Sequence, residues 1–126
     1  MKLVLDSGAL IALERNDRAM WRRLKAALLD ERIPVTHGGV LGQAWRGRGP
    51  RTTLLSLALK GVEVAALDED LGKLAGELLG RAKKADVIDA ALVLIASDGD
   101  SIVTSDPADL HHLSEVAGRH IDLVGV

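Results

Sequence analysis

The chain has 126 residues and a formal net charge of −2, and 48% of its residues are hydrophobic. These values fit one domain with a core of Leu, Val, Ile and Ala, because there is no Phe or Tyr and only two Trp. The absence of Cys excludes disulfides, thiolate metal sites and cysteine nucleophiles. The charge is not that of a general nucleic-acid binder, and two aromatic residues leave little room for stacking on bases.

The first apolar run follows Met1-Lys2 and is too short for the core of a signal peptide. No apolar run approaches the roughly 18 residues that a membrane span needs. We therefore expect a cytoplasmic protein without a membrane segment. The charges are unevenly spread, since basic residues crowd 15–25 and 46–51 while acidic residues gather in 63–77 and 86–109.

Short apolar runs alternate with helical patterns along the whole chain. The predicted strands are 2–6, 33–36, 62–67, 101–104 and 121–126. The predicted helices are 9–15, 16–31, a glycine-rich one within 37–50, 52–60, 68–84, 86–97 and 106–117. This alternation predicts an α/β fold in which a parallel sheet of about five strands is covered by helices on both faces. We assign residues 1–126 to a single domain.

Acidic residues follow two of the predicted strands and begin the most apolar helix. Asp6 ends the first strand, and Asp106 comes directly after the strand 101–104. Asp86 and Asp89 lie in the first turn of the helix 86–97 and, being three apart, share one face. The carboxyl ends of parallel strands meet at the edge of the sheet where α/β folds place their sites. We therefore expect these four carboxylates to converge.

Each of these acids also has a purely structural interpretation. Asp6, Asp86 and Asp106 stand where a helix cap is needed. Asp89 is harder to explain, because a lone carboxylate among apolar residues is costly unless it is paired or bound to metal. Clustered carboxylates repel one another unless a cation lies between them, and oxygen ligands suit Mg²⁺ or Mn²⁺.

The four histidines do not form a zinc pattern. His111 and His112 are adjacent on a helix that we expect to be exposed. We interpret His37 and His120 as surface or loop residues without a chemical role.

Four segments together resemble the PIN-domain family, in particular the VapC-type toxins of bacterial toxin–antitoxin pairs: LVLDSGALIALE, VLGQAWRG, DVIDAALV and IVTSDPADL. The resemblance covers the chain in length and element order. It implies a three-layer PIN-like fold with a Mg²⁺ site. By position the site residues are Asp6, Gln43, Asp89 and Asp106, with Asp86 as an extra acid and Ser7, Thr104 or Ser105 as accessory hydroxyls.

The resemblance also implies an activity and partners. The family suggests a metal-dependent endoribonuclease that cuts transfer or ribosomal RNA, forms a homodimer and is inhibited by a VapB-like antitoxin. Asp6, Asp89 and Asp106 would be metal ligands, and Asp86 or Asp106 would orient the attacking water. Two basic residues, Arg46 and Arg48, are candidates for RNA phosphates, although a solvated helix end explains them equally well.

Two positions depart from the family pattern. Gln43 stands where the second acid is usually Glu, which removes one negative charge, and Gly8 stands where a hydroxyl residue is common. The first departure supports an alternative, a catalytically weak PIN domain that binds RNA or protein. Two other folds with an acid after the first strand fit poorly. A receiver domain needs a Lys after its fifth strand, and a haloacid-dehalogenase-like phosphatase needs a second acid where Gly8 stands.

Overall fold

The protein is described by a computed structural model that covers all residues 1–126. Five parallel strands form one sheet in the order β3-β2-β1-β4-β5. Their bounds are β1 Leu3–Leu5, β2 Val35–His37, β3 Glu63–Ala65, β4 Ser101–Thr104 and β5 Asp122–Gly125. The predicted α/β class and strand number are therefore confirmed. The central strand, β1, pairs with β2 on one side and β4 on the other, so the chain reverses its direction of winding at this strand.

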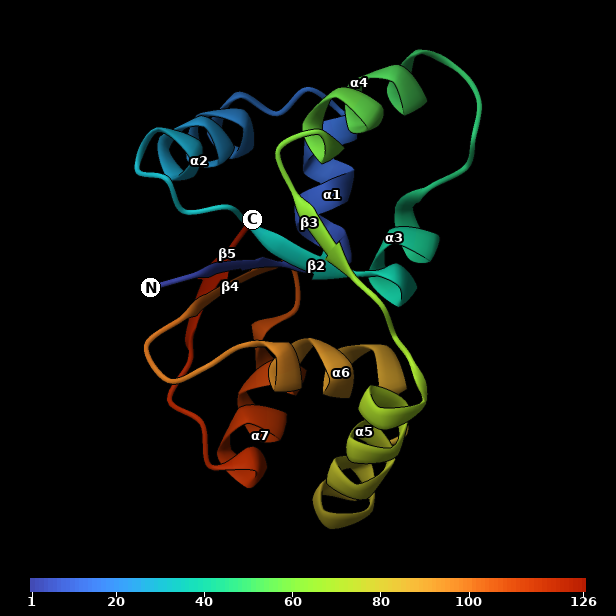
Figure 1. Cartoon of the computed structure of the whole chain (residues 1–126), viewed down its shortest axis with the longest axis vertical. Helices are drawn as coiled ribbons and strands as arrows, with labels where there is room; N and C mark the ends of the chain where they lie inside the picture. Colours follow the sequence, from blue (N-terminus) through green and yellow to red (C-terminus); the bar gives the residue numbers. More distant parts are fainter.

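Helices cover both faces of the sheet (Figure 1). One layer holds α1 Ser7–Glu14, α2 Arg18–Leu29, α3 Gly38–Ala44 and α4 Pro50–Leu59. The other holds α5 Glu69–Ala82, α6 Val87–Ile95 and α7 Pro107–Ala117. A core of 26 buried apolar residues fills the space between the layers and the sheet. No helix is both long and apolar enough to cross a membrane.

The helix α6 lies in the core, as its composition predicted. Its residues Ala90, Ala91, Leu92 and Val93 are fully buried. The strand β3 differs from the prediction of a buried apolar strand, because two of its three residues are exposed. It lies inside the predicted range 62–67 and forms one edge of the sheet, where a strand has a neighbour on one side only.

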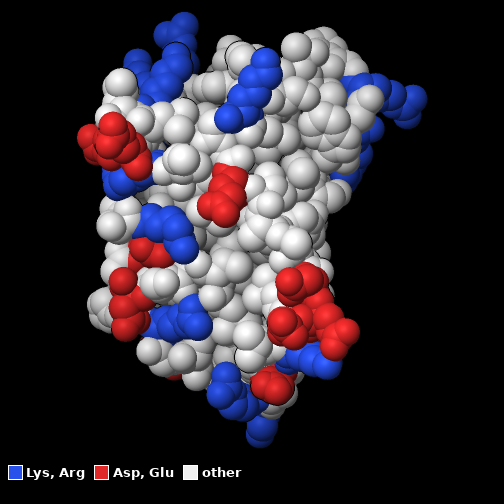
Figure 2. Space-filling view, viewed as in Figure 1, with Lys and Arg blue, Asp and Glu red and all other residues white.

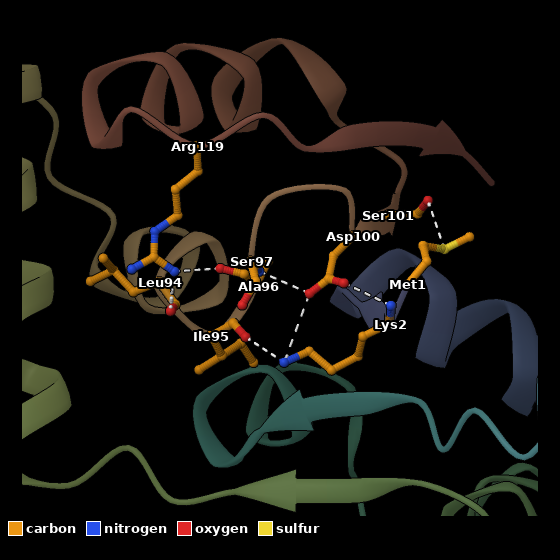
Figure 3. A network of polar contacts seen from close by, with 9 residues as sticks. All are labelled: Met1, Lys2, Leu94, Ile95, Ala96, Ser97, Asp100, Ser101 and Arg119. Atoms are coloured by element: carbon orange, nitrogen blue, oxygen red, sulfur yellow. Dashed lines mark hydrogen bonds and ion pairs between the residues drawn. The ribbon is translucent and has the colours of Figure 1, made fainter.

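A buried acid organises the edge of the sheet where the strands begin (Figure 3). Asp100 accepts hydrogen bonds from the backbone N–H groups of Lys2, at 2.7 Å, and Ser97, at 2.8 Å. The ammonium group of Lys2 lies 3.8 Å from the same carboxylate. Close by, the guanidinium of Arg119 donates to the carbonyl group of Ala96 at the end of α6. This network joins β1, α6 and the turn before β4, and it leaves Asp100 without a role in the acid cluster at the opposite edge.

The glycine at position 8 is required by close packing. A Cβ atom there would lie 2.9 Å from the backbone nitrogen and 2.8 Å from the Cβ of Ser105. In contrast, a Cβ on Gly80 in α5 would meet no atom within 4 Å. The absent hydroxyl residue at position 8 is thus a consequence of how closely α1 approaches the segment after β4.

We expect Gly8→Ala to destabilise the fold by about 1–3 kcal/mol, because the segment at Ser105 must move to admit the methyl group. Gly80→Ala is the matched control and should stabilise the fold by about 1 kcal/mol, the usual gain in an open helix position. Urea denaturation of the two variants measures both effects. An equal gain in stability for both would show that the contact between α1 and Ser105 is loose.

Candidate active site

A hydrogen-bonded chain joins the carboxyl ends of the two central strands. The hydroxyl of Thr104 donates to Oδ2 of Asp6 at 2.8 Å and accepts from the backbone N–H of Asp106 at 2.9 Å. The other carboxylate oxygen of Asp6 accepts from the backbone N–H of Ser7 at 2.7 Å. Asp6 and Thr104 are both buried. The position of the Asp6 carboxylate is therefore fixed, and the accessory hydroxyl at Thr104 is in contact with it.

The start of α6 presents two more carboxylates. Oδ1 of Asp86 accepts from the backbone N–H groups of Ile88, at 3.0 Å, and Asp89, at 3.1 Å, so Asp86 is the N-cap of α6. The capping interpretation of this exposed residue is confirmed. Asp89 lies in the first turn of the same helix and is half-buried. Its carboxylate accepts no hydrogen bond from any donor of the chain.

Burial and neighbouring charges together raise the pKa of Asp89 from 3.8 to about 7. The largest cause is desolvation, followed by repulsion from the carboxylates of Asp86, Asp6, Asp109 and Asp106. Acids from three parts of the chain thus act on one carboxylate. No cation of the chain forms an ion pair with Asp89.

The capping interpretation of Asp106 is confirmed in position only. Asp106 is the N-cap residue of α7, but its side chain makes no hydrogen bond to the N–H groups of the first turn. Its exposed carboxylate therefore remains free to act at the site. Asp109, one turn further on, is exposed and lies 3.7 Å from the ammonium group of Lys84.

The prediction that His37 is a surface or loop residue is wrong. His37 ends β2 and is fully buried. Its Nδ1 accepts from the backbone N–H of Gly39 at 3.1 Å, so its Nε2 donates to the carbonyl oxygen of Ile88 at 2.9 Å. This residue joins β2, α3 and the first turn of α6, directly beside Asp89. The sequence carried one signal for it, the position of His37 at the end of a strand, immediately before a helix that needs a cap.

The remaining candidates lie at the surface around this edge. Gln43 is exposed in α3, and its side chain makes no hydrogen bond within the chain. Arg46 and Arg48 follow on the exposed α3–α4 connection. Nη1 of Arg46 donates to the carbonyl oxygens of Gly42 and Trp45, which leaves its other nitrogens free. Ser7, at the start of α1, is half-buried, and Ser105, beyond β4, is exposed.

The oxygen donors at this edge suit a hard cation in charge and chemistry. In this conformation, however, no three Asp, Glu or His side chains lie close enough together to hold one metal ion. Mg²⁺ commonly keeps several waters and is held by one or two carboxylates. The arrangement therefore fits an ion that is held by few direct ligands and bound to the rest of the cluster through water.

Comparison with known proteins gives a structural match only. No protein-family model matches the sequence, and no curated protein does. Among solved structures, the fold is similar to a chain in the crystal structure of VapBC2 from Rickettsia felis bound to a DNA fragment from their promoter. The TM-score is 0.70, the match covers 98% of both chains, and the sequences are 12% identical. This likeness shows that the chain has a PIN-like fold.

The raised pKa of Asp89 predicts how stability depends on pH. Below pH 3.8 the carboxyl group is protonated in the folded and unfolded states, so it costs nothing. Between pH 3.8 and about 7 the unfolded chain loses this proton before the folded chain does, so stability falls as pH rises. Above about pH 7 the carboxylate is charged in both states, and the full loss of folding stability from its burial and repulsion is present.

We therefore expect Asp89→Asn, measured without divalent metal, to stabilise the fold at pH 8 and to have little effect near pH 4. The gain should be on the order of 1–3 kcal/mol, less than the full pKa shift implies, because solvent reaches the carboxylate. Denaturation midpoints at the two pH values measure it. Glu77→Gln, at an exposed position in the middle of α5, is the control. Equal effects at both pH values would contradict the crowding of charge around Asp89.

Proposed function

We propose that this chain is a metal-dependent endoribonuclease of the VapC toxin type. The observation that carries the proposal is the half-buried carboxylate of Asp89, surrounded by four other acids and without a donor or cation of its own chain. The PIN-like fold supports it, since the structural neighbour is a chain of a VapBC2 complex. A stable fold would gain from replacing such a carboxylate, so its presence points to a cation that the protein binds in use.

Mg²⁺, or Mn²⁺, would be held by Asp6, Asp89 and Asp106, some of them through water. Bound there, the ion would polarise the phosphodiester and lower the pKa of a bound water. Asp6 keeps unused lone pairs beside its two hydrogen bonds, so the contact with Thr104 orients it without saturating it. The hydroxyl of Thr104 thus has a positioning role.

Hydrolysis requires a water to attack phosphorus in line with the leaving 3′-oxygen. The products are a 5′-phosphate on one fragment and a 3′-hydroxyl on the other. Asp106 is suited to orient this water, because its carboxylate is exposed and not used as a cap. Asp86 is a weaker choice, since one of its oxygens already caps α6. Arg48, together with the free nitrogens of Arg46, would bind the RNA phosphates.

The partners we propose are structured RNA, a VapB-like antitoxin and a second copy of the chain. RNA targets of the transfer or ribosomal class follow from the sequence resemblance alone. The antitoxin follows from the resemblance and is supported by the VapBC2 complex in which the structural neighbour was solved. Sedimentation of the purified chain tests the homodimer. A strictly monomeric chain at micromolar concentration would exclude it.

We expect the purified chain to cut total cellular RNA into discrete fragments with Mg²⁺ or Mn²⁺ and not with a chelator. Asp89→Asn should lower this cleavage by at least about 100-fold, because it removes both a ligand and a negative charge. Glu77→Gln should cleave like the wild type. Full activity of a folded Asp89→Asn variant, or equal cleavage with chelator, would reject this mechanism.

A second candidate is a catalytically weak domain that binds RNA or protein. Gln43 favours it, because an exposed neutral amide stands where the family places a carboxylate, and no three acids share one ion in this conformation. If the active-enzyme proposal holds, Gln43→Glu should change the cleavage rate by less than about tenfold, or about 1.4 kcal/mol. A larger gain would mean that the natural chain is compromised and would support the binding module. The same RNA cleavage assay measures this variant.

A further inference from the structure

A mainly apolar hollow of about 390 Å³ lies between α3 and α4. The hollow lies against α3, the helix that carries Gln43 and that begins directly after β2. The strand β2 pairs with β1, which Asp6 follows. Its walls combine glycines, leucines and one aromatic ring: Gly38, Leu41, Gly42, Trp45 and Leu59. The mechanism above assigns no role to this hollow.

The two glycines of the hollow are not required by the packing of the chain. Gly38 and Gly42 are four apart on α3 and share one helix face. A Cβ atom on either would meet no atom within 4 Å, unlike one on Gly8. Gly42, which lies inside the helix, nevertheless costs about 1 kcal/mol relative to Ala. A bare helix face kept at this cost leaves room for a flat group from outside the chain.

The aromatic wall of the hollow is unusually open. Trp45 ends α3, and 38% of its surface is exposed. Its indole N–H has no acceptor in the chain, whereas the indole N–H of Trp21 donates to the carbonyl oxygen of Leu13 at 3.1 Å. Two tryptophans argued against stacking as a general mode of binding, but one base needs only one ring.

Three arginines follow the aromatic wall within six residues. Arg46, Arg48 and Arg51 are exposed, and none of them forms an ion pair. The hydrogen bonds of Arg46 to the carbonyl oxygens of Gly42 and Trp45 hold one of these cations beside the ring. In Figure 2, basic side chains gather toward the part of the molecule formed by α2, α4 and the α3–α4 connection, while many acidic ones lie over α5.

This charge distinguishes between the possible occupants. A second copy docked here about a two-fold axis close to the arginines would bring the two arginine groups together, which is unfavourable. A nucleic-acid strand brings a planar base for the hollow and phosphates for the arginines. The near-neutral chain thus offers a local cationic rim where its overall charge predicts none.

We propose that this hollow binds one unpaired RNA base, stacked on Trp45 and lying over Gly38 and Gly42, with neighbouring phosphates on Arg48 and Arg51. The inference rests on the proposed function for the identity of the nucleic acid. It adds that the substrate presents a single-stranded nucleotide beside the acid cluster. RNA in a continuous duplex would leave the hollow empty, because its bases are stacked and paired.

The test uses the full chain carrying Asp89→Asn, so that RNA is bound without being cut. A labelled eight-nucleotide oligoadenylate and a duplex of the same length serve as probes, with anisotropy for affinity and tryptophan fluorescence for contact. The single strand should quench the fluorescence of Trp45 and bind more tightly than the duplex. Trp45→Ala should weaken binding at least about fivefold, and Trp45→Phe should keep most of the affinity while losing the quenching.

The glycine face provides a variant that separates binding from folding. Gly42→Ala should stabilise the chain, since nothing in the chain opposes the methyl group, and yet weaken RNA binding several-fold. Gly80→Ala should stabilise it without any effect on binding. Unchanged affinity in both Trp45→Ala and Gly42→Ala would overturn the inference. So would a loss of self-association in these variants without a change in RNA binding, because the hollow would then join two copies.

The outcomes remain separable from those of the proposed function. Quenching of Trp45 by RNA, with no cleavage by the wild-type chain, would support the base-binding hollow and reject the nuclease. Metal-dependent cleavage that is unaffected in both hollow variants would support the nuclease and reject the base-binding hollow.

Discussion

The crowding of carboxylates around Asp89 is the constraint on which the structure of this edge depends. Desolvation and four neighbouring acids raise the pKa of Asp89, and no cation of the chain forms an ion pair with this carboxylate. The fold accommodates this repulsion because hydrogen bonds to other groups fix two of the neighbouring carboxylates. Asp6 is fixed by Thr104 and Ser7, and Asp86 is fixed as a helix cap. The repulsion therefore acts most strongly on Asp89, which has no hydrogen-bond partner and, unlike the exposed Asp106, is half-buried.

The order of the strands explains why these acids meet at all. The chain winds outward from β1 through β2 to β3, then returns through α6 to place β4 on the other side of β1. The loops after β1 and β4 therefore leave the sheet side by side, which is where α/β folds open a crevice. His37 completes the arrangement from β2, since it holds the first turn of α6 against the end of that strand. The end of β2 thus holds the start of α6 beside the sheet edge where β1 and β4 end.

The sequence predicted those parts of the fold that depend on local pattern. Alternating apolar runs indicated the sheet and its helices. A cap at Asp86 was one of two interpretations, and it could be named because capping depends on residues two and three positions away. The failures concern contacts between distant parts of the chain. The burial of His37 follows from its bond to Ile88, 51 residues further on. Asp106 is a residue type that often caps helices, but its side chain makes no cap hydrogen bond. Its backbone N–H instead donates to the hydroxyl of Thr104. Gly8 looked like a departure from a family pattern, yet it is dictated by the approach of Ser105.

The neutral side chain of Gln43 acquires a different meaning once the surroundings of α3 are considered. Desolvation and the repulsion of four acids already raise the pKa of Asp89 to about 7, and a carboxylate at position 43 would add to that repulsion. It would also set a negative charge on the same short helix as the bare glycine face and two residues before Trp45, where the arginines favour an anion. An amide there keeps an oxygen donor toward a cation and reduces repulsion of the RNA backbone. If the chain binds a metal ion and RNA as proposed, the neutral Gln43 would lower the charge of the metal site and at the same time favour the approach of the RNA, so its two effects would oppose each other.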